Sequence, residues 1–87
     1  MELIDQIRNY VFDNYVKPAR AKGDKSVIVI SGEVHSRMDL TNQMPAVCNA
    51  LRSERKWNPD NVNLIREIRK SNVNKDSSTN RFVLGIE

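Results

Sequence analysis

Apolar and polar residues alternate with a helical period over the first part of the chain. The apolar positions recur at three- and four-residue steps. They are Leu3, Ile4, Ile7, Tyr10, Val11 and Tyr15. This pattern predicts an amphipathic helix over residues 2–16 that extends to about residue 22. Pro18 should interrupt or kink it, because proline has no N–H and disfavours helical geometry at the preceding residue.

Two further apolar residues of this helix, Phe12 and Val16, fall on the opposite side of the α-helical wheel. A helix with apolar groups on two sides can contact a second surface. The pattern therefore predicts a second contact for Phe12 and Val16, either with the C-terminal strand or in a homodimer through the N-terminal helix.

The next apolar run consists of β-branched residues and predicts a short buried strand over residues 26–30. Ser31 is then suited to be the N-cap of a helix over residues 32–38. That helix should bury Val34 and Met38, which are four residues apart. Leu40 is expected to lie beneath the turn that follows.

A second helix is expected over about residues 43–55, with Asn42 as its N-cap and Pro45 in its first turn. Its buried side is predicted to consist of Met44, Val47, Cys48 and Leu51. The facing arc holds Ala46, Asn49, Ser53 and Lys56, with Gln43, Ala50 and Arg52 at its flanks. One side of this helix should therefore be left exposed.

The last third of the chain predicts a β-hairpin over residues 62–87. Residues 58–61 form a turn signal, and a polar loop follows at residues 71–80. The tail then alternates, with Phe82, Leu84 and Ile86 on one face. Residues 64–68 fit a helix as well as a strand, and we interpret them as a strand because an alternating strand follows the loop.

Length and charge narrow the class of protein. The chain has 87 residues, a formal charge of +3 and a pI of about 9.3, which is typical of one small, mildly basic domain. Residues 1–16 contain Arg8 and three acidic residues, whereas residues 17–87 contain thirteen Lys and Arg against eight Asp and Glu. A polyanion would be attracted to the second part. Without a signal sequence or a long apolar run, we expect a cytoplasmic protein, on the nucleoid in a prokaryote.

The expected order of helix, strand, helix, turn, helix and hairpin resembles the winged helix-turn-helix superfamily of DNA-binding domains. The segment GEVHSRMDL (residues 32–40) is similar to the family's first helix and its apolar turn residue. Val47, Ala50 and Leu51 match the pattern of its second helix. Asp39 stands where the family often has Gly, at a turn position that can need a positive φ. The gap from Leu40 to Val47 is also two residues longer. The resemblance implies a small α+β winged helix: a three-helix core, a short strand after the first helix and a C-terminal hairpin wing.

By this resemblance the helix-turn-helix covers residues 31–56, its second helix enters the major groove, and the hairpin is the wing. Gln43 and Asn49 could read adenine, Arg52 could contact guanine or phosphate, and Ala46 could meet a thymine methyl group. Cations of the wing, and Arg37 on the first helix of the helix-turn-helix, would contact phosphates. The expected DNA-binding residues are Arg37, Gln43, Ala46, Asn49, Arg52, Ser53, Lys56, Arg66, Arg69, Lys70, Lys75 and Arg81.

Catalysis is not expected, and neither is a metal or cofactor. Cys48 lies on the apolar stripe, which favours a buried, inert thiol, and a single Cys with His35 provides too few ligands for a metal. Trp57 beside the turn favours a core anchor over a base-stacking residue, although stacking by Trp57, Tyr10 and Tyr15 on single strands stays open.

Three functions are compatible with these patterns. The first is a non-catalytic duplex DNA-binding protein, sequence-specific or general, such as a small transcriptional regulator. The second is a winged-helix module that binds a protein and never contacts nucleic acid. An RNA-binding or ribosome-associated role is the third. The exposed helix arc could equally be a solvated surface, and the hairpin cations could protect an edge strand from aggregation.

Overall fold

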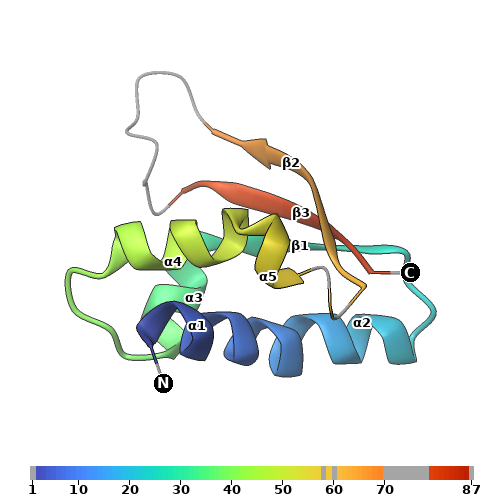
Figure 1. The fold of residues 1–87 in the computed structure, drawn as a ribbon, viewed down its shortest axis with the longest axis horizontal. Helices are drawn as coiled ribbons and strands as arrows, with labels where there is room; N and C mark the ends of the chain where they lie inside the picture. Colours follow the sequence, from blue (N-terminus) through green and yellow to red (C-terminus); the bar gives the residue numbers. More distant parts are fainter. Residues whose placement is uncertain (1, 58, 60, 70–78, 87) are drawn as a thin grey trace.

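The chain forms a layer of helices against a three-stranded antiparallel sheet, a mixed α+β fold (Figure 1). The computed structural model describes residues 2–57, 59, 61–69 and 79–86. The helical elements are α1 (Leu3–Val11), the π-helical segment η1 (Phe12–Val16), α2 (Lys17–Ala21), α3 (Ser31–Arg37), α4 (Met44–Arg52) and α5 (Glu54–Trp57). The strands are β1 (Ser26–Ile30), β2 (Asn63–Ile68) and β3 (Arg81–Gly85), in the spatial order β1-β3-β2.

The first helix runs as predicted to residue 21, but it changes its register on the way. Between α1 and α2 the chain forms η1, where Lys17 N–H donates to the Phe12 carbonyl five residues earlier. In this register residues five apart lie on the same side, so Val16 follows Val11 into the core. Pro18 falls in the first turn of α2. The proline therefore coincides with a change of hydrogen-bond pattern and not with the end of the helix.

This register corrects the dimer surface expected from the sequence. Val16 has no exposed surface and belongs to the core. Phe12 is half-buried against the same core, and the cationic groups of Lys17 and Arg20 lie 5.5 and 5.7 Å from the centre of its ring. Phe12 and Val16 thus do not form a common outer surface.

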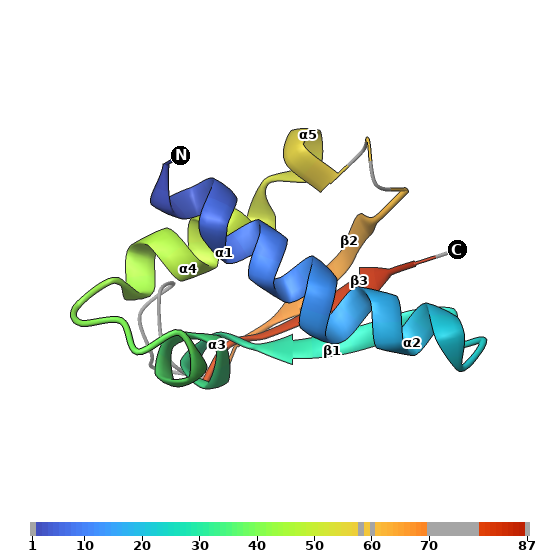
Figure 2. The ribbon, with the colours of Figure 1, turned by 90° about the horizontal axis from the view of Figure 1, so that it is seen from below.

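Strand β1 is confirmed over residues 26–30, but it is not the buried strand that its composition predicts. It pairs on one side with β3 and forms an edge of the described sheet. Val29 is buried, whereas Ile28 is 54% exposed because its side chain points to the sheet face without helices. The helices cover the other face, as the view from below also shows (Figure 2).

The two caps expected for α3 and α4 are different in the structure. Ile30 is the N-cap of α3, and Ser31 is already helical while its N–H donates to the Asn80 carbonyl, as in a continued strand. Gln43, not Asn42, is the N-cap of α4, and its N–H donates to Nε2 of His35 at 3.1 Å. Neither cap residue makes a side-chain capping bond.

The turn between α3 and α4 contains two residues with positive φ, Asp39 at 55° and Asn42 at 53°. The expected left-handed backbone at Asp39 is confirmed. The extra length of this turn is accommodated by the second left-handed residue, since Asn and Asp tolerate this conformation better than most side chains. Leu40 packs against the core as predicted.

The core lies between the helices and the inner face of the sheet. The predicted burial of Val34, Val47, Cys48 and Leu51 is confirmed, as is that of Phe82, Leu84 and Ile86; Met38 and Met44 pack at the margin. Residues 63–68 form the predicted strand, so the hairpin is confirmed up to its connection, most of which lies outside the described residues. None of the described helices is long and apolar enough to cross a membrane.

Candidate nucleic-acid interface

Helix α4 turns one side to the core and one to solvent, as its sequence predicts. Gln43 and Asn49 are exposed on the outer side. Ala46 is half-buried and packs at the edge of the core, so its methyl group is less accessible than expected. Ala50, placed at a flank of the exposed arc, has no exposed surface. The available side of α4 is thus narrower than predicted: Pro45 and Asn49 are exposed on the helix, and Gln43 is exposed at its N-cap.

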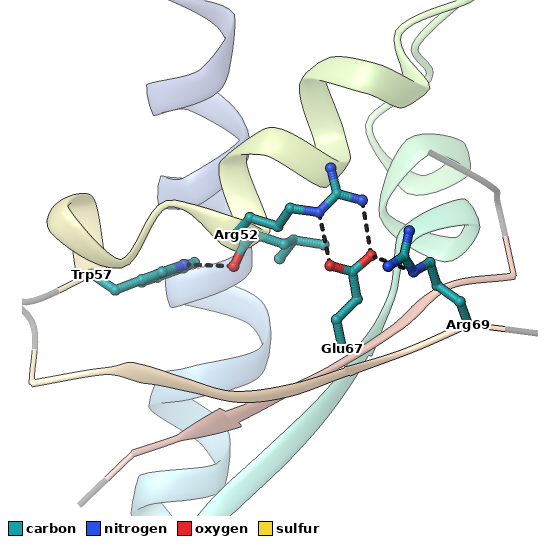
Figure 3. Close-up of polar contacts among 5 residues, drawn as sticks. Arg52, Trp57, Glu67 and Arg69 are labelled. Atoms are coloured by element: carbon teal, nitrogen blue, oxygen red, sulfur yellow. Dashed lines mark hydrogen bonds and ion pairs between the residues drawn. The ribbon is translucent and has the colours of Figure 1, made fainter. Parts of the chain in front are cut away.

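The helix expected to reach residue 55 ends at Arg52. Ser53 is the C-cap, with φ of −79° and ψ of 82°, and the chain then begins the separate turn α5. Ser53 is half-buried at this break and does not continue the exposed side of α4. The break brings Trp57 back to the core, where its indole N–H donates to the Leu51 carbonyl at 3.3 Å (Figure 3). Trp57 is therefore a core anchor, as favoured above.

Arg52 does not extend into solvent as a base-reading residue would. Its Nε and Nη2 atoms each donate to a carboxylate oxygen of Glu67 at 2.8 Å, a bidentate pair between α4 and β2 (Figure 3). Its guanidinium also lies 5.8 Å from the centre of the Phe82 ring. A bidentate, partly buried pair of this kind fixes the orientation of both partners. Arg52 therefore fixes the position of α4 relative to the hairpin, which corrects its expected role in DNA contact.

A β-bulge in β2 makes this pair possible. Leu64 is opposite Leu84 and Arg66 is opposite Val83, so Ile65 is an extra residue in β2. One extra residue reverses the side to which every later side chain points. Glu67 consequently faces α4, opposite Phe82, while Arg66 faces the other side of the sheet.

The same bulge separates the cations that the sequence placed on one arm. Arg69 lies on the α4 side, 3.6 Å from Glu67, and half of its side chain is exposed. Arg66 and Arg81 are exposed beside Val83 on the opposite, uncovered face. The side chain of Lys56 and the residues Lys70 and Lys75 lie outside the described part of the chain. The structure thus brings only Arg69 of the described wing cations close to α4.

Arg37 of α3 is positioned by η1. Its guanidinium lies 5.9 Å from the centre of the Tyr15 ring and 3.7 Å from Glu33. Tyr15 donates its hydroxyl to Glu33 at 2.5 Å. Burial of the phenol, together with this bond, raises the pKa of Tyr15 above its usual value. Arg37 therefore has its contacts on α3 and η1, and none of them joins it to the amides of α4.

The carboxylate of Glu67 is the residue that sequence reasoning missed. It lies between the guanidiniums of Arg52 and Arg69, so two positive charges share one negative charge where α4 meets the hairpin (Figure 3). The three side chains therefore carry one net positive charge, and half of the Arg69 side chain is exposed. Together, the exposed amides of Gln43 at the N-cap of α4 and of Asn49 within it, and the guanidinium of Arg69, provide donors, acceptors and one cation.

Compared with known proteins, the chain matches no family model, and neither a curated protein nor a solved structure matches it. The described residues contain no group of three or more His, Cys, Asp or Glu placed to hold a metal ion.

Proposed function

We propose that this protein binds duplex DNA, without catalysis, through the exposed side of α4 and the adjoining hairpin. The order of elements and the sheet order β1-β3-β2 support the winged-helix arrangement that the sequence resembles. A protein of this kind would act in the cytoplasm, on nucleoid DNA in a prokaryote.

The observation that carries the proposal is the exposure of Gln43 and Asn49 on α4, the helix whose Arg52 is joined to Glu67, and through it to Arg69, of the hairpin. Carboxamides offer a donor and an acceptor together, which is the pattern that adenine presents in the major groove. Arg69 supplies a positive charge for a phosphate. The Arg52–Glu67 pair would maintain the angle between α4 and the hairpin. The amides of α4 could then contact the bases of the same duplex whose phosphate Arg69 contacts.

Fluorescence anisotropy with labelled duplex DNA, measured over a series of salt concentrations, tests the proposal. We expect log affinity to fall linearly with log salt, because binding releases counterions from phosphates. The double variant Gln43→Ala/Asn49→Ala should weaken binding about tenfold or more, since a good amide–base contact contributes about 1–3 kcal/mol.

The matched control is Gln6→Ala, which removes an exposed amide from α1 and should leave the affinity unchanged. Equal losses in both variants, or no binding to any duplex at low salt, would contradict the proposal. Competition with duplex RNA and with single strands separates a DNA-binding role from an RNA-binding one.

A role in binding another protein has a specific observation in its favour. The large hydrophobic side chains exposed among the described residues, Ile28, Ile65 and Ile68, belong to the sheet and not to α4. If the protein is an interaction module that never contacts nucleic acid, the salt-dependent binding will be absent and the contact will map to these isoleucines.

A further inference from the structure

The two edges of the sheet differ in how well they are protected from pairing with another strand. Edge strands are usually blunted by charged side chains, proline or a bulge. Strand β2 has a bulge at Ile65 and the charged residues Arg66 and Glu67. Strand β1 reads Ser-Val-Ile-Val-Ile and has none of these features. In the view from below, β1 is the outermost strand on its side of the sheet (Figure 2).

The backbone hydrogen bonds show which groups of β1 point outward. Opposite residues in an antiparallel ladder form two kinds of pair that alternate along the strands. In one kind the two residues exchange both N–H···O=C bonds, and in the other the N–H and C=O groups of both residues point away from each other. The Ile86 N–H donates to the Lys25 carbonyl, and the Ser31 N–H donates to the Asn80 carbonyl. The odd-numbered residues of β1 therefore bond to β3. The N–H and C=O of Ser26 and Ile28, and the N–H of Ile30, point to the open edge.

We propose that a second copy of this chain pairs with this edge, so that β1 and its counterpart form an antiparallel ladder centred on Ile28. The outward-pointing residues are 26, 28 and 30, and the register that pairs all three places Ile28 opposite its own copy. In that register the two Ile28 residues exchange both N–H···O=C bonds, and Ser26 lies opposite Ile30 of the other copy. The two sheets become one six-stranded sheet with a two-fold axis perpendicular to it.

The side chains at this edge fit a second copy. Ile28 is 54% exposed, and self-pairing would bring two such side chains together on the uncovered face. Strand β1 contains no charged residue, so no like charges meet along the ladder. Lys25, just before β1, comes opposite the start of the other copy's α3, whose first turn contains Glu33. An isologous contact of this type closes on itself and does not propagate into fibres.

Dimerisation through β1 does not require DNA binding, but it would fix how the two α4 helices are oriented. A two-fold axis perpendicular to the sheet keeps the inner faces of both copies on the same side. Both α4 helices would then face the same side of the dimer, which is the symmetry that a palindromic DNA site presents.

Sedimentation equilibrium of the full chain without DNA tests the dimer directly. We expect a monomer–dimer equilibrium in the wild type. Ile28→Lys should weaken dimerisation about tenfold or more, because it places two cations opposite each other and removes an apolar pair. The matched control is Ile65→Lys on β2, which is equally exposed at 55% and should dimerise like the wild type.

A cysteine at the centre of the ladder gives a second readout that disturbs the fold less. Hydrogen-bonded opposite residues have Cα atoms about 5.5 Å apart, within the range that a disulfide spans. Ile28→Cys should therefore form a disulfide-linked dimer under mild oxidation far faster than Ile65→Cys, while the native Cys48 is buried. A wild type that stays monomeric at high concentration, or equal behaviour of the position-28 and position-65 variants, would overturn the proposal. Loss of DNA binding with the dimer intact would overturn only the proposed function.

Discussion

The side of α4 and the outer edge of β1 are both accessible, but they present opposite chemistry. Gln43 and Asn49 present exposed amides at the N-cap of α4 and within it, and the carboxylate of Glu67 joins Arg52 of this helix to Arg69, which follows β2. The edge of β1 presents an exposed isoleucine and backbone groups that point away from β3. A polar, cationic surface can exchange water and counterions for a polyanion, whereas an edge strand needs another strand. On the two proposals above, DNA and a second copy would bind separate surfaces of one small domain and would not compete.

The largest effect is expected where α4 is joined to the hairpin. Arg52→Ala leaves the carboxylate of Glu67 partly buried beside a single arginine, and should destabilise the fold by about 2–3 kcal/mol in urea unfolding. Asp13→Ala, which breaks a largely exposed pair with Lys17, is the control and should cost less than about 0.5 kcal/mol. Equal costs for the two variants would mean that the Arg52–Glu67 pair does not fix α4.

Loss of the dimer through β1 should also weaken DNA binding. Ile28→Lys should lower affinity for a duplex with two half-sites about tenfold, because the second copy no longer raises the effective concentration. The same variant should bind a short, single-site duplex like the wild type. A comparable loss on both duplexes would show that β1 contributes to DNA contact itself and would remove the separation of roles.

A smaller difference is expected in the salt dependence of DNA binding when cations on the two faces of the sheet are removed. Arg69→Gln should reduce the salt slope of DNA binding by about 0.9, the value for one phosphate contact. The double variant Arg66→Gln/Arg81→Gln removes two charges from the opposite face and should change the slope by less than Arg69→Gln alone. The reverse order would place the DNA on the uncovered face of the sheet.

The smallest effect concerns the contact between η1 and α3. Tyr15→Phe removes a hydroxyl bond to Glu33 and should cost about 1 kcal/mol at neutral pH. The pKa of Tyr15 is raised in the folded state, so its contribution is fully present below the unfolded pKa near 10 and is lost as the pH rises through the folded pKa. The difference in stability between wild type and variant should therefore shrink in strongly alkaline solution. A constant difference there would exclude this bond as the cause.

Much of the fold follows from local patterns in the sequence. The alternation of Phe82, Leu84 and Ile86 and the apolar stripe of α4 each depend on one periodicity, and both are confirmed. Val16 shows where this reasoning fails. A wheel drawn at 100° per residue cannot show the π-helical register that turns this residue inward.

The candidate site was harder to predict, because it depends on contacts between distant residues. The Arg52–Glu67 pair joins residues fifteen positions apart, and it forms because the bulge at Ile65 reverses the side to which Glu67 points. Nothing in the local pattern of β2 marks that bulge. For the same reason the sequence grouped Arg66, Arg69 and Arg81 on one arm, although they lie on two faces.

Chemical-shift mapping of the labelled protein, titrated with a short duplex DNA, tests the central claim most directly. The account predicts that the side-chain amides of Gln43 and Asn49 and the backbone near Arg69 shift together and saturably. Ile28, Val83 and Arg66 should be unaffected by the duplex. Shifts confined to β1 and the uncovered face of the sheet, with α4 unchanged, would contradict it.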